Sequence, residues 1–181
     1  NPRGRYAGVE DVTFAAPLKL HRDEPALVQI TAEPDEDGAW RCVLRSTRTL
    51  KNGREQTTVH FEASVQLAEM PLLPSLPSAY FPEERVSQRD IYRRFFHGPR
   101  FQVLQRAEAV AVQGLMAEAA VEHGLIAEGL LTDPLVLEAA FQAAGLHRIA
   151  LDGVMALPAS IDAVELVRSA VEGEALQVVV H

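Results

Sequence analysis

Apolar and polar residues alternate over one long stretch of this chain, from residue 57 to residue 67. A period of two is typical of a β-strand, so these eleven positions predict a strand with one face buried against a core. His60 falls on the polar face of this strand, and we expect it at the surface. The preceding Asn52-Gly53 pair favours a tight hairpin turn, which makes residues 40–46 the expected partner strand.

Two earlier stretches complete the expected sheet of the N-terminal third. Residues 8–14 and 27–32 have the composition of strands, and turn-forming residues follow the second of them. Residues 1–67 are therefore predicted to form an antiparallel meander. Four prolines then fall within residues 68–88, and proline sustains neither a helix interior nor a central strand. We expect this segment to link two structural units.

The second unit, residues 89–181, is expected to combine strands with one long helix. A short helix over residues 90–96 should end at Gly98-Pro99, because this pair favours a turn. The elements expected after it are strands at 101–112 and 115–121, the long helix at about 133–147, and strands at 161–171 and 175–181.

The long helix is apolar almost all round. Thr132 or Asp133 can cap it, Pro134 suits its first turn, and Gly145 is its expected end. Only Glu138 and Gln142 interrupt the apolar residues, and their spacing puts a carboxylate and an amide one turn apart on one face. A helix of this kind is normally surrounded by other elements, and a buried carboxyl favours its protonated form. Glu138 is therefore a candidate for proton transfer, unless one edge of the helix simply faces solvent.

A long buried helix among antiparallel strands predicts an α+β protein with a hot-dog fold, in which an antiparallel sheet wraps around the helix. The 181 residues fit one large domain or two small ones, and 48% hydrophobic residues are ordinary for a folded protein. The sequence contains no run of about 18 or more apolar residues, which is the length needed to cross a bilayer. The single Cys42 excludes an intramolecular disulfide, so a cytoplasmic protein is expected.

The charge pattern narrows the expected partners. A net charge of -8 argues against a nucleic-acid-binding protein, which normally has a basic surface, and we expect neither a nucleic acid nor a membrane as partner. One stretch is rich in arginine: Arg85, Arg89, Arg93, Arg94, Arg100 and Arg106. These side chains are either solvated surface or a docking place for an anionic partner. The sequence shows neither a metal-ligand cluster nor a glycine-rich phosphate loop, so no metal is expected.

Three segments of the second half have a distinctive order and spacing. They are His97-Gly98-Pro99-Arg100-Phe101, then Glu138 four residues before Gln142, and then Leu157-Pro158. In this order they resemble the Tyr-Gly-Pro-x-Phe, Asp-x-x-x-Gln/His and Leu-Pro segments of the dehydratase domain of type I polyketide synthases and related polyunsaturated fatty acid synthases. The chain departs from that pattern twice, with histidine at the tyrosine position and glutamate at the aspartate position.

The resemblance implies a double hot dog that removes water from a 3-hydroxyacyl thioester held on an acyl carrier protein, giving a 2-enoyl thioester. It implies that Glu138 protonates the departing hydroxyl and that Gln142 holds the carboxyl or the hydroxyl by a hydrogen bond. The residues expected at the substrate are His97, Gly98, Pro99, Phe101 and Pro158. From the residue type alone, the core is favoured over the substrate as the place of Phe101.

The resemblance also implies which partners the chain has and that the family's catalytic histidine is not part of it. The substrate would arrive on the phosphopantetheine arm of the carrier with no other cofactor, and other synthase domains and a second copy of the domain would be partners. The family's catalytic histidine belongs to a His-x-x-x-Gly-x-x-x-x-Pro motif that none of the six histidines matches. We therefore expect a fragment of a larger synthase, with both hot-dog units incomplete and the catalytic histidine outside it.

Two other functions stay open from the sequence. A catalytically silent hot-dog unit that shapes an acyl chamber or the synthase dimer would agree with the glutamate and the unmatched histidine motif. A hot-dog thioesterase would instead use the carboxyl to position water and would release a free acid.

Overall fold

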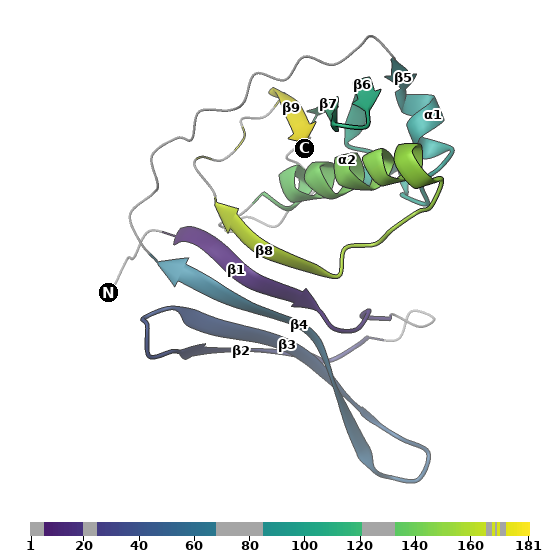
Figure 1. The fold of residues 1–181 in the computed structure, drawn as a ribbon. Coiled ribbons are helices and arrows are strands. Elements are labelled where there is room, and N and C mark those ends of the chain that lie inside the picture. Colours follow the sequence, from purple (N-terminus) through teal and green to yellow (C-terminus); the bar gives the residue numbers. More distant parts are fainter. Residues whose placement is uncertain are drawn as a thin grey trace. The chain divides into compact units, whose positions relative to one another are not determined.

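The structure is a computed structural model that describes residues 6–19, 25–67, 85–120, 133–165, 168, 170 and 173–181. The chain forms two compact units, each built around one antiparallel sheet (Figure 1). The first unit contains Asn1–Leu73 and Pro158–Val167, and the second contains Pro74–Leu157 and Arg168–His181. Among the described residues, no helix is both long enough and apolar enough to span a membrane.

The sheet of the first unit has five strands in the order β2-β3-β4-β1-β8. Their bounds are Tyr6–Phe14 for β1, Val28–Pro34 for β2, Trp40–Thr49 for β3, Glu55–Leu67 for β4 and Ser160–Glu165 for β8. The predicted hairpin is confirmed, since β3 pairs with β4 across a turn in which Gly53 has a φ of 76°. Every neighbouring pair in this sheet is antiparallel.

Two expectations about this sheet are wrong. β1 does not continue the meander, because it pairs with β4 and β8 rather than with β2. The connection from β1 to β2 is too long for a tight hairpin and carries Pro17 and Pro25. The β8 segment, expected in the second unit, belongs to the first. Gly8 allows this pairing, since a Cβ there would lie 2.5 Å from the carbonyl oxygen of Val164.

The surface position expected for His60 is also wrong, since the residue is only 4% exposed. Leu44 pairs with Phe61 and Arg45 pairs with Val59, which leaves His60 as an extra residue in β4. Such a β-bulge interrupts the alternation on which the prediction rested. The segment after β1 covers His60, and the backbone N–H of Ala15 donates to the His60 carbonyl oxygen at 2.9 Å.

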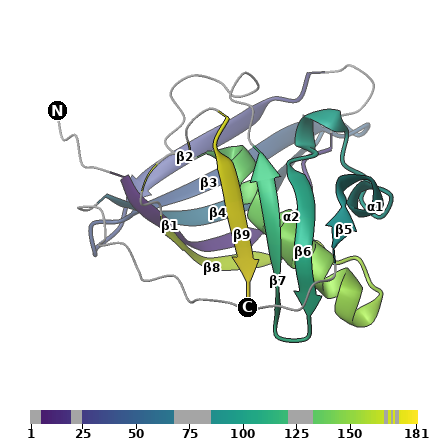
Figure 2. The same cartoon turned by 90° about the horizontal axis from the view of Figure 1, so that it is seen from above.

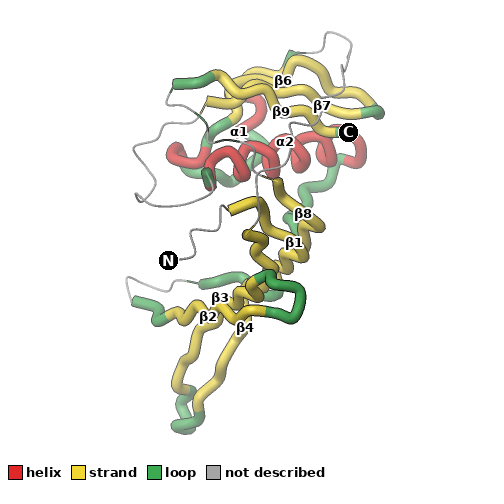
Figure 3. The backbone as a smooth tube through the Cα atoms, turned by 90° about the vertical axis from the view of Figure 1, so that its left-hand side faces the viewer, coloured by secondary structure: helices red, strands yellow, loops and turns green. Residues whose placement is uncertain are grey.

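The sheet of the second unit has four strands in the order β5-β6-β7-β9 (Figure 2). Its elements are β5 Val86–Ser87, α1 Gln88–Tyr92, the 3-10 helix η1 Pro99–Phe101, β6 Leu104–Ala111, β7 Gly114–Ala120, α2 Pro134–Asp152 and β9 Ala175–Val180. In Figure 3 the strands form one layer of this unit, and α1 and α2 form the other. The predicted linker lies outside the described residues up to residue 84, and its last residues form β5 and begin α1.

The hydrophobic core of the second unit lies between α2 and the strands β6, β7 and β9. The helix buries one face, formed by Leu135, Ala139, Gln142, Ala143 and Leu146. Ala140 and Ala144 are exposed, so the helix is buried along one side rather than all round. Gln142 is polar, yet it lies on the face of the helix that packs against the core.

The ends of α2 follow one prediction and depart from another. The Asp133 side chain caps the helix by accepting the Leu135 N–H at 3.2 Å, as its position before Pro134 predicts. Gly145 does not end the helix, which continues to Asp152 and stops where Gly153 has a φ of 70°. Gly145 instead makes room for a ring, since a Cβ there would lie 3.4 Å from an edge carbon of Phe95.

Candidate active site around Glu138

Helix α2 places Glu138 and Gln142 on the same face, as the spacing predicts. The Gln142 side chain is buried, with 2% exposure of the residue, and the Glu138 side chain is 23% exposed. Gln142 Nε2 donates a hydrogen bond of 2.7 Å to Glu138 Oε1. The helix therefore orients one carboxylate oxygen through a buried amide one turn further on.

His97 contacts the same carboxylate oxygen from the segment between α1 and η1. The distance from His97 Nε2 to Glu138 Oε1 is 2.9 Å, and the His97 side chain is 18% exposed. Phe96 stacks on the imidazole with ring centroids 4.9 Å apart, and Phe95 packs edge-on at 5.3 Å. The structure thus brings together three of the predicted site residues: His97, Glu138 and Gln142.

The contacts of His97 and Gln142 leave the two carboxyl oxygens of Glu138 in different environments. Oε1 accepts from the Gln142 amide and lies against His97 Nε2, whereas Oε2 has no hydrogen bond to any described residue. His97 Nδ1 is buried and has no hydrogen-bond partner among the described residues. This favours the imidazole tautomer with its proton on Nε2, which donates that proton to Oε1 of Glu138. Oε1 is therefore the anchored oxygen, and Oε2 is the oxygen that can carry a proton.

Tyr92 completes the hydrogen-bond network, and sequence reasoning missed it. Its hydroxyl donates to Gln142 Oε1 at 2.6 Å and accepts from the Leu104 N–H at 2.7 Å. The pKa of Tyr92 is raised to about 12, because burial and, to a smaller extent, the charge of Glu138 raise it more than the Leu104 hydrogen bond lowers it. Tyr92 is therefore a neutral donor that fixes the Gln142 amide. No spacing along the chain relates the end of α1 to the middle of α2, so the sequence carried no signal for this contact.

The remaining predicted residues lie in two places. The Phe101 carbonyl oxygen accepts from Gln142 Nε2 at 2.6 Å, but the residue is 52% exposed, so the core alternative for Phe101 is wrong. Gly98 and Pro99 are exposed at the start of η1, and Pro99 borders a cavity of about 310 Å³. Pro158 is exposed in the first unit. The roles of these four residues at the substrate stay predictions.

The raised pKa of Tyr92 predicts a late alkaline transition. A hydroxyl whose pKa is about 12 in the folded protein and 10.0 when unfolded contributes no pH dependence below pH 10. Stability is then lost as the pH rises from 10 towards 12, because only the unfolded chain releases the proton in that range. A spectrophotometric titration of tyrosinate should show a late phase, and Tyr92→Phe should remove it. An unchanged titration in the variant would contradict the assignment.

Comparison with known proteins gives one family and a set of similar structures. The family described as polyketide synthase dehydratase N-terminal domain matches residues 69–180. No curated protein sequence matches the chain. A dehydratase domain of a trans-AT polyketide synthase from Brevibacillus brevis is 18% identical with a TM-score of 0.75, over 92% of this chain and 61% of that one. The dehydratase domain from the CurK module of curacin polyketide synthase is 18% identical with a TM-score of 0.77, over 99% and 66%.

An inactive mutant of the CurK dehydratase, in which one aspartate is replaced by asparagine, is also similar. It is 18% identical with a TM-score of 0.74, over 99% of this chain and 66% of that one. The chain spans 61% to 66% of the length of these solved structures. The prediction of a hot-dog fold is confirmed by these matches, since antiparallel sheets with one long helix are shared across nearly the whole chain.

Proposed function

The chain belongs to the polyketide synthase dehydratase family, and we propose that it supplies the acid of a site that removes water from a 3-hydroxyacyl thioester. The substrate would be held on an acyl carrier protein, and the product would be a 2-enoyl thioester. The observation that carries this proposal is the anchoring of Glu138 Oε1 by His97 and Gln142, which leaves Oε2 free to transfer a proton.

Elimination of water needs an acid and a base in one site. The α-proton of the thioester is weakly acidic and hydroxide is a poor leaving group. The Glu138 carboxyl would deliver the proton on Oε2 to the β-hydroxyl while the C–O bond breaks. A base would take the α-proton, and the electrons of that C–H bond would form the new double bond. Glu138 would be left as a carboxylate that must regain a proton before the next cycle.

His97 is not assigned as the base of this reaction. Its Nε2 lies on Glu138 and its Nδ1 is buried, so neither ring nitrogen is free to take a proton from the substrate. We assign it instead as a positioning residue for the carboxyl. The base would come from a part of the dehydratase domain that this chain does not span. The inactivity of the CurK aspartate-to-asparagine mutant supports a carboxyl as the acid in this family.

The proposed partners follow from the proposed substrate. The acyl carrier protein would present the acyl chain on its phosphopantetheine arm, with no further cofactor, and the other domains of the synthase would supply and consume the intermediates. Arg85, Arg89, Arg94 and Arg100 are exposed, which supports docking of an anionic partner on this unit. A second copy of the domain is a further proposed partner, and the protein is proposed to act in the cytoplasm.

The proposal is tested with the complete synthase polypeptide that contains this chain. Incubation with a 3-hydroxyacyl carrier protein should lower the mass of the carrier by one water, with the thioester still intact. A thioesterase would instead release the acid and return the free carrier. An unchanged carrier mass across several acyl lengths, with a folded protein, would favour a catalytically silent unit.

A further inference from the structure

The first unit contains a cavity that has no part in the proposed dehydration. Its volume is about 500 Å³, and it lies between residues 16–19 and 25–27 on one side and strands β3 and β4 on the other. All the residues that line it belong to the first unit, whereas His97, Glu138 and Gln142 belong to the second. The cavity is therefore a separate candidate site.

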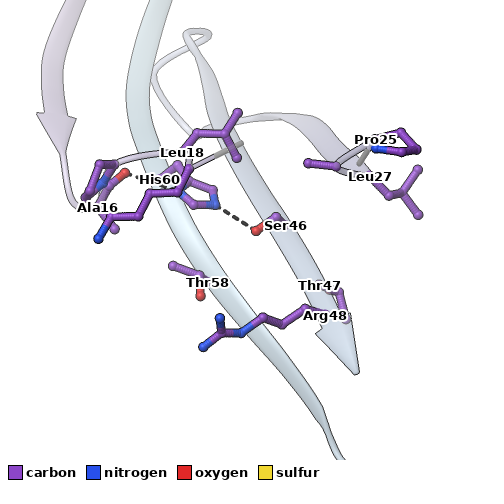
Figure 4. Close-up of a pocket in the computed structure, with 12 residues that line it drawn as sticks. Ala16, Leu18, Pro25, Leu27, Ser46, Thr47, Arg48, Thr58 and His60 are labelled. Atoms are coloured by element: carbon purple, nitrogen blue, oxygen red, sulfur yellow. Dashed lines mark hydrogen bonds between the residues drawn. The ribbon is translucent and has the colours of Figure 1, made fainter. Parts of the chain in front are cut away.

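A buried histidine forms the polar floor of this cavity. Figure 4 shows the His60 ring between the Ala16 carbonyl and the Ser46 hydroxyl. A carbonyl oxygen only accepts, so His60 Nδ1 carries a proton and donates to it at 3.1 Å. In the neutral ring Nε2 then accepts from the Ser46 hydroxyl at 2.7 Å. The β-bulge that inserts His60 into β4 thus fixes both the loop and the serine at the cavity wall.

The charge of the cavity is opposite to that of the chain. The net charge of the chain is -8, yet the described residues that line the cavity include the cations Lys19 and Arg48 and no carboxylate. The Arg48 guanidinium donates to Gln56 Oε1 at 2.8 and 3.0 Å, and this neutral partner leaves its charge uncompensated. Neither cation forms an ion pair with a described residue. Two like charges facing one space favour a ligand of opposite charge.

The remaining lining gives the cavity a polar and an apolar side. Thr58 has a hydroxyl without a partner among the described residues, and it lies near Arg48 in Figure 4. Leu18 and Leu27 line the same space from the two loop segments. The site therefore offers two cations and a hydroxyl donor for an oxygen-rich head, and an apolar wall for a short aliphatic part.

We propose that this cavity binds a phosphate monoester with a short aliphatic chain. Lys19 and Arg48 would meet the two negative charges of the phosphate, and Thr58 would donate a hydrogen bond to it. A carboxylate would neutralise only one of the two cations. A phosphate monoester of this kind is a free metabolite, since the arm of a carrier protein is a phosphodiester whose single charge would neutralise only one of the two cations. This inference does not depend on the proposed dehydratase activity.

The test measures binding of n-butyl phosphate to the full chain by isothermal titration calorimetry. We expect a dissociation constant in the millimolar range or below, and at least tenfold weaker binding to the Lys19→Gln/Arg48→Gln variant. Inorganic phosphate should bind more weakly than n-butyl phosphate, and butyrate more weakly still. A matched control is Lys51→Gln/Arg54→Gln, which removes two exposed cations from the β3–β4 turn and should leave binding within about twofold.

The outcomes separate a site from general charge attraction. Equal loss of binding in the two double variants would overturn the proposal, as would no binding of n-butyl phosphate to the unaltered chain. The four substituted positions of the two double variants are all exposed, so circular dichroism should show the same fold in each variant. Tighter binding of pantetheine 4′-phosphate than of n-butyl phosphate would show that the cavity recognises a longer free phosphate monoester. Equal binding of the two would show that the phosphate and a short aliphatic part are enough for recognition.

Discussion

Glu138→Gln is expected to slow water loss from the 3-hydroxyacyl carrier protein by about 10²–10⁴-fold, the usual contribution of a general acid. Glutamine has the size of glutamate, and its side-chain oxygen can still accept from His97 and Gln142 as Oε1 does now. What the amide loses is the ability to deliver a proton from the position of Oε2. The measurement is a single-turnover reaction, followed by the mass of the carrier, with the complete synthase polypeptide.

A matched substitution on the same helix tests whether the loss of any carboxylate from α2 would slow the reaction. Asp152 lies at the end of α2, where its exposed carboxylate pairs with Arg148 at 2.7 Å. Asp152→Asn should leave the rate within about twofold, since an exposed ion pair contributes little to stability. Full activity of Glu138→Gln would remove Glu138 from the role of acid. A loss of the same size in Asp152→Asn would assign the effect to the helix rather than to the carboxyl.

The parts of the site that lie on one helix could be predicted from the sequence. The meeting of Glu138 and Gln142 depends only on helical geometry, in which residues four apart share a face. The segment of His97 was identified through its resemblance to a known motif. Its contact with Glu138 joins two motifs that the sequence shows only as separate segments. The two positions at which this chain departs from the family pattern touch each other, 2.9 Å apart, so the two departures form one local change.

The parts that depend on distant segments could not be predicted. Tyr92 is 50 positions from Gln142 in the sequence, and only the packing of α1 within the second unit brings them together. β8 was expected as a strand because its own residues favour one, but its partner is β1, more than a hundred residues earlier in the chain. Local patterns determine which segments are strands or helices, whereas long-range packing determines which of them pair.

Single residues also changed the expected pattern where tertiary contacts outweigh local preference. Gly145 has the character of a helix end, but the ring of Phe95 occupies the space beside it and the helix continues. The extra residue at His60 shifts the alternation of β4, which no count of apolar positions reveals. In both cases the local rule fails where a side chain from another element packs.

Gln142→Leu is expected to lower the free energy of unfolding by about 2–3 kcal/mol, because it leaves several polar groups without their partner. The Tyr92 hydroxyl would lose its acceptor, and the Phe101 carbonyl oxygen and Glu138 Oε1 would each lose a donor. Leucine is similar in size to glutamine, so at this buried position the loss reports the hydrogen bonds rather than a cavity. Urea denaturation measures it, and Gln113→Leu, at an exposed turn position, should change stability by less than about 0.5 kcal/mol.

A double-mutant cycle with Tyr92→Phe decides whether these groups act as one network. Tyr92 and Gln142 share a hydrogen bond of 2.6 Å, so the losses of free energy of unfolding in the two single variants should be non-additive by about 0.5–2 kcal/mol. Either substitution should destabilise the protein less when the other is already present. The same variants should slow water loss, because Gln142 also anchors Oε1 of Glu138. Additive stabilities would show that the tyrosine and the amide act independently. An unchanged rate in Gln142→Leu would show that the Glu138 carboxyl keeps its position without the amide, leaving His97 as the sole anchor among the described side chains.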